Sequence, residues 1–326
     1  MHKLYPIKFY PVFKEKVWGG NRLAPLYGKN PGELPNCGES WEMAAFAGHD
    51  SVVENGFLEG NTLSELIEVY MGDLVGDKVY ETFGREFPLL FKFIDTDEKL
   101  SVQVHPDDEL AWERHKSNGK SEMWYIADAK PEARIYAGFS TNVSKEIVLQ
   151  HIKENTLQNL LLSGKVKPGD VFYIPAGKVH AIGAGVVLCE IQQASDITYR
   201  LYDWNRSGND GKPRELHVEQ ALEVIDFSKA GEFNRQYPPV NNAAVSLVND
   251  RHFTTNLLSF DKIYETDYFQ IDSFVALVCL EGSFRISFTG GTESVKKGEM
   301  ILLPAEIKQF SFIPSEPSKV LETFIP

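Results

Sequence analysis

Short runs of apolar residues dominate the first two thirds of the chain. In some of these runs the apolar residues are continuous, and in others they alternate with polar residues. This pattern predicts strands rather than helices. Residues 88–95 form a nearly continuous apolar run, typical of a buried strand, although the run carries one lysine, Lys92. In residues 99–105 polar and apolar positions alternate. The segments that we predict as strands are 4–13, 39–46, 88–95, 99–105, 121–127, 134–139 and several between 171 and 198.

Four other segments carry helix signals. Residues 61–71 repeat apolar residues three or four apart after an Asn or Thr start. Pro106 is followed by three acids, which suit the first turn of a helix that continues to residue 116. We also predict helices over residues 142–162 and 215–225. The apolar positions of the helix at 142–162 would be Ile147, Leu149, Ile152 and Leu157.

The chain changes character after residue 240. Residues 237–240 contain two prolines and are the best candidate for a linker. From residue 254 to 325, short apolar runs are separated by Gly, Asp and Pro, which indicates a β-sandwich or barrel. We therefore predict a mainly β protein of two domains, residues 1–240 and 241–326, with a few helices attached to the first.

An internal repeat supports two β-domains. Residues 167–180 and 296–309 each contain a glycine, an acid, four apolar or aromatic residues and then Pro-Ala. We interpret each copy as a turn, a buried strand and a second turn. The second copy has Gln309 where the first has His180. We therefore expect one working site, in the first domain, and no metal site in the second.

Composition excludes several classes of function. The chain has 326 residues, 43% of them hydrophobic, and a net charge of −13, which argues against nucleic-acid and anionic-membrane partners. Its three cysteines form no CxxC pair, so neither a disulfide framework nor a thiolate metal site is expected. The N-terminus has no apolar segment typical of a signal peptide, and no apolar run is long enough to cross a membrane. We expect a cytoplasmic protein.

Gln103 and His105 are the first candidates for chemistry. Residues two apart on a strand point to the same face, so an amide and an imidazole would stand where apolar residues are expected. A shared metal ion would explain them, with Glu122 and His180 as further ligands. Two imidazoles and one carboxylate suit zinc or another divalent first-row metal. Because this set brings only one negative charge, the bound ion would remain a good Lewis acid.

Each of these residues also has an ordinary structural explanation. His105, which stands before Pro106, could mark the entry to a helix, and His180 could be a hydrogen-bonded core histidine. Gln103 and Glu122, taken alone, could be polar residues in contact with solvent. Their combination favours a metal site over four separate structural roles.

The motifs resemble a known family. The spacing from Gly169 through Pro175 and Gly177 to His180 is similar to the second metal-binding motif of the cupin superfamily. The segments QVHP at 103–106, KSE at 120–122 and SDITYR at 195–200 resemble those of type I mannose-6-phosphate isomerases in their short form. The resemblance extends by motif over residues 9–226 and by architecture over the C-terminal part.

The resemblance implies two cupin-type jelly-roll β-barrel domains and one Zn²⁺, or another divalent first-row metal, per chain. The family's ligands fall on Gln103, His105, Glu122 and His180, and its catalytic arginine falls on Arg200. Residues of its substrate pocket fall on Lys92, Ser101 and Lys120. The chain departs from the long forms in having Lys-Ser-Glu before the carboxylate ligand and Leu-Tyr-Asp-Trp after the arginine.

The implied reaction interconverts mannose 6-phosphate and fructose 6-phosphate through an enediol, with Arg200 stabilising the developing charge. The partner would be a small sugar phosphate, and the protein a monomer or homodimer. The general base is left open among Glu190, Asp196, Lys120, His49 and metal-bound water. Lys92 could pair with Asp95 or Glu42 instead of a phosphate, and Asp203 could pair with Arg200 or Arg206. Two other classes fit the motifs: a non-haem Fe(II) cupin oxygenase, and a sugar-binding cupin without catalysis.

Overall fold

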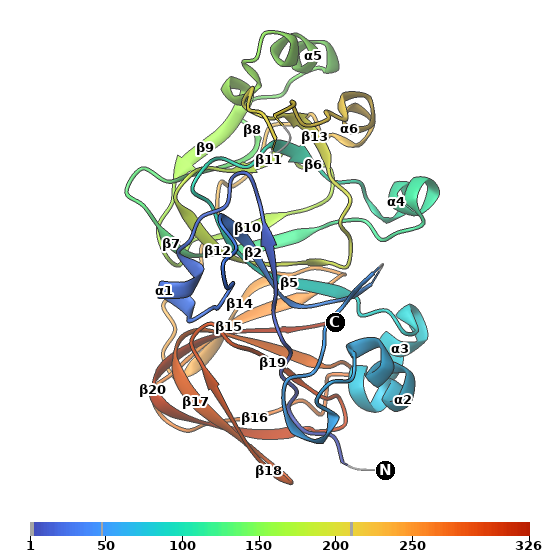
Figure 1. Cartoon of the computed structure of the whole chain (residues 1–326), viewed down its shortest axis with the longest axis vertical. Helices are drawn as coiled ribbons and strands as arrows, with labels where there is room; N and C mark the ends of the chain where they lie inside the picture. The colour runs from blue at the N-terminus through green and yellow to red at the C-terminus, as the bar shows by residue number, and fades with distance from the viewer. Residues whose placement is uncertain (1–2, 47, 209–210) are drawn as a thin grey trace.

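The computed structural model describes residues 3–46, 48–208 and 211–326. The prediction of a mainly β protein is confirmed, and the strands pair as open sheets stacked in layers (Figure 1). The middle layer is a six-stranded antiparallel sheet. In spatial order its strands are β1 (Val12–Glu15), β2 (Cys37–Met43), β5 (Leu89–Asp95), β12 (Val186–Gln193), β7 (Glu122–Ala129) and β10 (Val171–Ile174).

A five-stranded sheet packs on one face of this middle layer. Ile135 and Ile182 of the five-stranded sheet share a core with Trp124 and Leu188 of the six-stranded sheet. The strands of the five-stranded sheet, in order, are β13 (Tyr199–Tyr202), β6 (Val102–Val104), β11 (His180–Ile182), β8 (Arg134–Phe139) and β9 (Leu161–Lys165).

The C-terminal sheet packs on the other face of the middle layer. Its main path is β14 (Ala243–Asn249), β15 (Thr254–Phe260), β20 (Gln309–Phe324), β17 (Val275–Phe288) and β18 (Gly291–Lys296). Beside this path, β16 (Tyr264–Asp267) pairs with β20, and β19 (Met300–Leu303) pairs with β17. A small separate pair joins β3 (Ala45–Phe46) to β4 (His49–Asp50).

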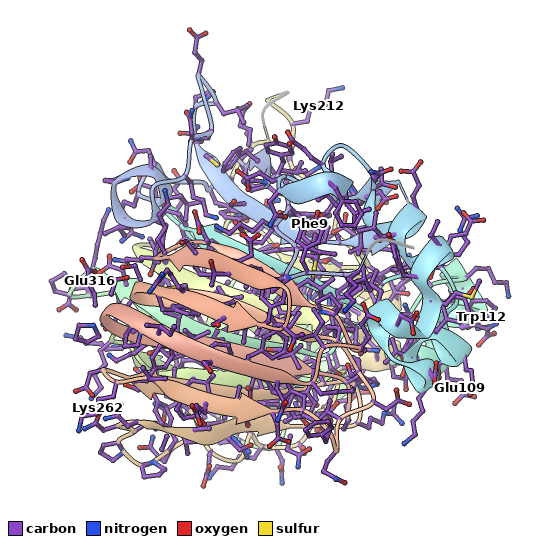
Figure 2. All side chains as sticks on the ribbon, turned by 90° about the horizontal axis from the view of Figure 1, so that it is seen from below. Phe9, Glu109, Trp112, Lys212, Lys262 and Glu316 are labelled. Carbon is purple, nitrogen blue, oxygen red and sulfur yellow. The ribbon has the colours of Figure 1, made fainter. Side chains whose placement is uncertain are left out.

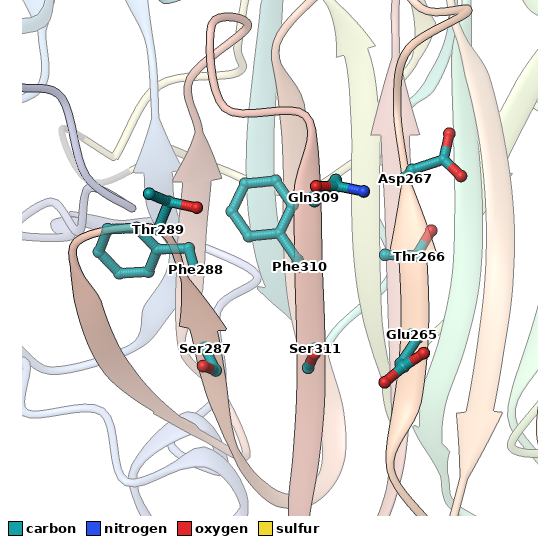
Figure 3. Close-up of a pocket in the computed structure, with 9 residues that line it drawn as sticks. All are labelled: Glu265, Thr266, Asp267, Ser287, Phe288, Thr289, Gln309, Phe310 and Ser311. Carbon is teal, nitrogen blue, oxygen red and sulfur yellow. The ribbon is translucent and has the colours of Figure 1, made fainter.

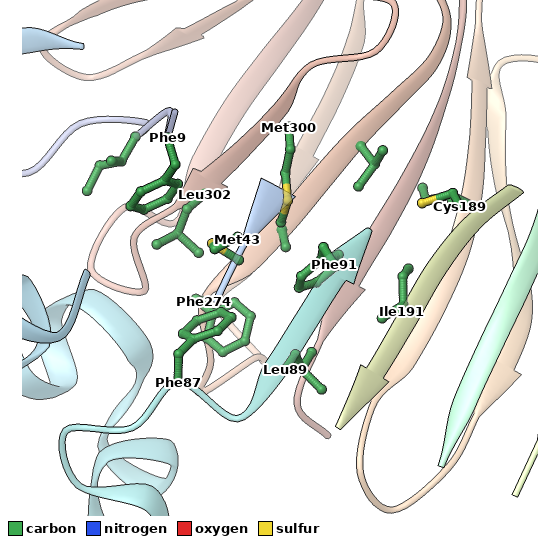
Figure 4. Close-up of a cluster of buried hydrophobic side chains, with 14 of the residues drawn as sticks. Phe9, Met43, Phe87, Leu89, Phe91, Cys189, Ile191, Phe274, Met300 and Leu302 are labelled. Carbon is green, nitrogen blue, oxygen red and sulfur yellow. The ribbon is translucent and has the colours of Figure 1, made fainter. Parts of the chain in front are cut away.

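The middle layer is buried on both faces, which explains the continuous apolar run at residues 88–95. Phe91 of β5 packs with Phe274 and Met300 of the C-terminal part (Figure 4). Lys92 and Ile94 point to the opposite face, toward the five-stranded sheet. One core therefore spans the predicted boundary at residue 240, and the division into two domains stays a prediction.

Two expectations about strand length are wrong. The C-terminal strands were expected to be short, yet β17 has 14 residues and β20 has 16. Shifts in register between Cys279 and Phe284 let these two strands keep pairing past Gly282, because bulges accommodate residues that would otherwise end a strand. At the N-terminus, residues 4–13 form only isolated bridges before β1, since Pro6 and Pro11 cannot donate ladder hydrogen bonds.

The helices lie at the edges of the sheets. They are α1 (Leu23–Tyr27), α2 (Leu63–Val75), α3 (Asp77–Phe83), α4 (Asp108–His115), α5 (Lys145–Lys153) and α6 (Val218–Val224), with short 3₁₀ turns at Gly56–Leu58 and Leu157–Leu160. Thr62 and Glu65 form a capping box at the start of α2, and Asp107 caps α4. Figure 2 shows Glu109 and Trp112 of α4 at the surface. In the described part of the chain, no helix is long and apolar enough to cross a membrane.

The helix predicted over residues 142–162 is shorter than expected. It ends at Lys153, and Asn155 then takes a positive φ of 57° before the chain turns into β9. Ile147 was expected on the apolar face but is 42% exposed, and Val148 is buried instead. The apolar residues that continue into β9 extended the helical pattern beyond its true end. The helix predicted at 215–225 is likewise reduced to α6.

The internal repeat is visible in the structure. Gly169 and Gly298 both take positive φ values, 93° and 88°, in the turns that precede β10 and β19. Each four-residue strand is followed by a Pro-Ala turn and a new strand, which starts at His180 in the first copy and at Gln309 in the second. The two segments therefore share one local fold, and they differ at the residue that opens the following strand.

Candidate metal centre and active site

Three of the four predicted metal ligands lie together between the five-stranded and six-stranded sheets. His105 follows β6, His180 opens β11 and Glu122 opens β7. Their ligand atoms all lie within 4.8 Å of one another, and all three side chains are buried. Gln103 stands directly opposite His180 in the pairing of β6 with β11. The antiparallel pairing brings together residues that are far apart in the sequence.

Backbone carbonyls orient both imidazoles. Nδ1 of His105 donates to the carbonyl of Ile197, and Nδ1 of His180 donates to that of Lys178, each at 2.8 Å. Because a carbonyl only accepts, each proton is fixed on Nδ1 and each Nε2 keeps its lone pair. The Nε2 atoms lie 3.6 Å and 3.3 Å from the oxygens of Glu122.

Burial keeps both imidazoles neutral. Desolvation lowers the pKa of His180 to about 3. Desolvation, together with the positive charge of Lys120, lowers the pKa of His105 well below its usual value. Burial also raises the pKa of Glu122, an effect that Glu190 reinforces and Lys120 opposes. Neutral imidazoles beside a desolvated carboxylate form a donor set suited to a cation.

The residues fit a divalent metal ion. Nε2 of His105 and both oxygens of Glu122 are buried without a hydrogen-bond partner in the described residues. Leaving such groups unsatisfied costs about 1–3 kcal/mol each, and a shared cation would satisfy all three. The side-chain nitrogen of Gln103 lies 3.3 Å from Nε2 of His180. Since amide oxygen and nitrogen are assigned from such contacts, turning the amide would present its oxygen as a fourth ligand.

Lys92 faces this site from β5. Its Nζ donates to Gln192 at 2.7 Å and to Glu190 at 3.1 Å, and it lies over the ring of Trp41. Burial alone would lower the pKa of Lys92, but Glu190 and more distant acids outweigh burial and raise it. The partners proposed from sequence are wrong: in the structure Asp95 binds Arg22, and Glu42 binds Lys29.

Lys120 and Ser101 lie beside the predicted ligands. Nζ of Lys120 is buried 3.3 Å from an oxygen of Glu122, so it is not a solvated loop lysine. The hydroxyl of Ser101 lies 3.4 Å from the amide oxygen of Gln103. Two lysines and a hydroxyl therefore border the group of ligands, and these are groups that bind phosphate or sugar oxygens.

Arg200 is half-buried at the edge of the same site. Its Nε donates to the hydroxyl of Ser101 at 3.3 Å, and its Nη1 donates to the carbonyl of Glu215 at 2.8 Å. Asp203 pairs with Arg206, as one alternative predicted, and also with Arg214. The guanidinium of Arg200 thus remains free of a carboxylate partner among the interactions of the described residues, and it can meet a developing negative charge.

Comparison with known proteins identifies the family. Residues 7–143 match the family described as "Phosphomannose isomerase type I, catalytic domain". The chain is 38% identical over 312 residues to mannose-6-phosphate isomerase ManA of Bacillus subtilis, covering 94% of this chain and 95% of the relative. The chain belongs to the type I phosphomannose isomerase family. Mannose-6-phosphate isomerase of Streptococcus mutans, 34% identical over 313 residues, likewise covers 94% of the chain and 95% of its own length.

Solved structures agree with this assignment. The crystal structure of the mannose 6-phosphate isomerase from Bacillus subtilis covers 98% of this chain and 99% of its own, with a TM-score of 0.83 and 33% identity. A protein from Archaeoglobus fulgidus shares the fold, with a TM-score of 0.80 at 23% identity. The type I phosphomannose isomerase family is metal-dependent, and in this chain the buried cluster His105, Glu122 and His180 could hold a metal ion.

Three residues of the site were not predicted from the sequence. Gln192 binds Lys92, Trp124 donates to Glu190 at 2.9 Å, and Trp41 lies under the lysine. Strand alternation could have found two of them. Trp124 follows Glu122 by two positions, and Gln192 follows Glu190 by two, so each shares the face of a residue already singled out.

Two candidates for the general base, His49 and Glu190, lie near Trp41 and Lys92. The ring of His49 is centred 4.5 Å from that of Trp41, and burial, followed by the charge of Lys14, lowers its pKa. Glu190 is engaged by Lys92 and Trp124. A neutral histidine is able to accept a proton, whereas a carboxylate held by two donors is a weaker base. The choice among the candidates stays open.

The C-terminal sheet has a hollow of its own, of about 490 Å³ (Figure 3). It lies over β16, β17 and β20 and is lined by Glu265, Asp267 and Gln309, among others. Gln309 is the counterpart of His180 in the repeat. The lining contains neither histidine nor cysteine, so its donor set differs from that of the first copy.

Proposed function

We propose that this protein interconverts mannose 6-phosphate and fructose 6-phosphate, with zinc held by Gln103, His105, Glu122 and His180. The observation that carries the proposal is the buried His-Glu-His cluster with unsatisfied ligand atoms, in a chain that aligns with mannose-6-phosphate isomerases over nearly its whole length. Two imidazoles, one carboxylate and an amide favour zinc over magnesium or calcium, which prefer oxygen ligands alone.

The reaction removes a proton from C2 of the aldose and returns one at C1. Negative charge develops on the two oxygens of the enediol, and stabilising that charge is the main demand on the site. When bound, a divalent ion would supply Lewis acidity toward a sugar oxygen. Arg200 would add a fixed positive charge at the edge of the site, because its guanidinium is tethered to Ser101 and to the backbone at Glu215.

Lys92, Ser101 and Lys120 would bind the sugar phosphate. Lys120 and Ser101 border the ligand cluster and can offer an ammonium and a hydroxyl to substrate oxygens. Lys92 already donates to Glu190 and Gln192, so an ammonium with three protons has one left for the substrate. Lys92 would therefore help to orient the substrate, and it would share the binding of the phosphate with other groups.

We place the protein in the cytoplasm because its proposed substrate is a charged metabolite that does not cross membranes unaided. A monomer or homodimer is proposed as the working form. Sedimentation of the metal-loaded protein would distinguish the two.

We expect isomerase activity to depend on metal. In a coupled assay that detects fructose 6-phosphate formed from mannose 6-phosphate, EDTA should reduce turnover by at least ~10³-fold, because the charged transition state loses its strongest electrostatic partner. Zinc added back should restore the rate. Activity indifferent to exhaustive chelation would contradict the metal's role, and a folded, zinc-loaded protein without activity would contradict the proposed reaction.

We expect Arg200→Lys to lower kcat by ~10²–10³-fold while leaving KM within a few-fold. Lysine keeps the charge but cannot hold both the Ser101 hydroxyl and the Glu215 carbonyl with a planar fork. Steady-state kinetics and zinc content measured on the same sample would check this. Arg85→Lys, which changes an exposed pair with Glu68, is the matched control and should behave like wild type. An unchanged kcat in Arg200→Lys would remove this arginine from the mechanism.

A further inference from the structure

A turn of the C-terminal sheet reaches across to the catalytic part of the chain. This turn, Asp250–His252, joins β14 to β15. Nδ1 of His252 lies 2.6 Å from a carboxylate oxygen of Asp250, and its Nε2 lies 3.0 Å from an oxygen of Asp108 on α4. Arg251 adds a longer contact to Asp108 at 3.3 Å. The histidine therefore bridges two carboxylates that belong to different layers of the fold.

Asp108 in turn is hydrogen-bonded to the segment that precedes β7. Its Oδ1 accepts a hydrogen bond from the backbone amide of Gly119 at 3.0 Å and one from Nε2 of Gln193 at 2.8 Å. The side-chain oxygen Oε1 of Gln193 accepts a hydrogen bond from the backbone amide of Ser121 at 2.8 Å. The backbone amide of Gln193 donates to the carbonyl of Ser121 at 3.1 Å. Asp108 and Gln193 thus clamp residues 119–121 through the backbone.

Ser121 lies between two residues of the active site. Lys120 precedes it and Glu122 follows it, and their side chains meet at 3.3 Å. A shift in the backbone at Ser121 would move the ammonium and the carboxylate together. Misplacement by about 1 Å can lower a rate by ~10²-fold, so a clamp at this point affects chemistry and not only stability.

We infer that the Asp250–His252 turn is a positioning element for the reaction, acting through Asp108 and Gln193 on the segment that carries Lys120 and Glu122. The inference gives the C-terminal sheet a part in the active site, although none of its residues enters the site. An effect on the isomerase rate rests on the proposed function, whereas an effect on how well residues 119–122 are ordered does not.

Electrostatics support a strong link at His252. Burial alone would lower the pKa of His252, but the hydrogen bond and charge of Asp108, together with Asp250, outweigh burial and raise it. The hydrogen bond from His252 is the largest influence that lowers the pKa of Asp108. A hydrogen bond between charged partners is roughly twice as strong as a neutral one.

The test replaces His252 with leucine and with glutamine in the full-length, zinc-loaded protein. Leucine removes both bridges, whereas glutamine keeps a side-chain amide that can donate to Asp108. We expect His252→Leu to lower kcat/KM by ~10–100-fold and to speed amide exchange in the peptide spanning residues 117–123 by ~10-fold or more. His252→Gln should recover most of both quantities.

His151→Leu is the matched control. His151 on α5 is also partly buried and hydrogen-bonded, but its partner is Thr156 in the adjoining turn. This variant should leave both the rate and the exchange at 117–123 at wild-type values. A change in both variants would indicate general loosening and would overturn the inference.

A double-mutant cycle tests whether the clamp is one pathway. Gln193→Met interrupts the connection beyond Asp108, so the loss of kcat/KM in the double variant with His252→Leu should be smaller than the product of the two single losses. If the loss of kcat/KM in the double variant equals the product of the two single losses, His252 and Gln193 do not act through a shared path. If wild type lacks isomerase activity, the proposed function fails, and exchange at residues 117–123 still decides the inference. A folded His252→Leu protein with unchanged exchange would overturn it.

Discussion

Glu122→Gln is expected to abolish both metal binding and turnover. Glutamine has nearly the same shape but no charge, so the site would bring two neutral imidazoles and two amides to a divalent ion. We expect bound zinc to fall from one per chain to below ~0.1 and kcat to fall by at least ~10³-fold. Metal analysis after dialysis, together with the coupled assay, would measure both quantities.

The same variant should change how stability responds to metal. In the metal-free wild type, the Glu122 carboxylate is buried with neither oxygen hydrogen-bonded in the described residues, and burial raises its pKa. Removing zinc should therefore lower the melting temperature of wild type, because the buried Glu122 carboxylate then keeps only its longer contact with Lys120 at 3.3 Å. An amide carries no charge to desolvate, so the melting temperature of Glu122→Gln should not respond to chelator.

The control for this prediction is Glu132→Gln, which alters an exposed carboxylate paired with Lys165. It should retain zinc, turnover and the response to chelator, since exposed ion pairs contribute little. A Glu122→Gln protein that still bound one zinc tightly would show that the carboxylate is not a ligand. Calorimetry with and without chelator on all three proteins makes the comparison.

Lys92→Met should produce the second large effect, a loss of about 3–5 kcal/mol in the free energy of unfolding. Lys92 and Glu190 are both buried, and their ion pair has an N–O distance of 3.1 Å. Burial alone would raise the pKa of Glu190, but Lys92 and then Lys120 outweigh burial and lower it, so the carboxylate depends on these charges. Methionine removes the nearest counter-charge and leaves the acid in place.

The double variant Lys92→Met/Glu190→Gln separates structure from substrate binding. Neutralising Glu190 removes the unpaired charge, so most of the lost stability should return, as urea unfolding would show. If Lys92 also contacts the sugar phosphate, KM should remain raised in the double variant even though its stability has recovered. A normal KM would limit Lys92 to a structural role. Lys130→Met, which breaks an exposed pair with Asp97, should change stability by less than ~0.5 kcal/mol.

Local sequence patterns predicted much of the secondary structure. The run at residues 88–95 became β5, and the Pro-Asp-Asp-Glu signal became α4 with Asp107 as its cap. These elements are decided by alternation, capping and turn chemistry within a few residues, which the sequence displays directly. The failure at 142–162 shows the limit, because the helical pattern continued past the turn at Asn155 into a 3₁₀ turn and the first residues of β9.

The candidate ligands were recognisable in the sequence for a related reason. Gln103 and His105 stand out because two polar residues occupy one face of a strand, and His180 lies in a patterned turn. The motif resemblance then selected Glu122 from among many acids. The structure brings His105, Glu122 and His180 together and places Gln103 beside His180, and their role as metal ligands stays a prediction.

The sequence by itself determined most of the strand segments and which residues are candidate ligands. Only the tertiary structure decided the partner of Lys92, the double burial of the middle sheet and the bridge from His252 to Asp108. Those contacts join residues 98 and 144 positions apart. Hydrogen bonding and ion pairing depend on distances of about 3 Å, and no local pattern records which distant strand supplies the other atom.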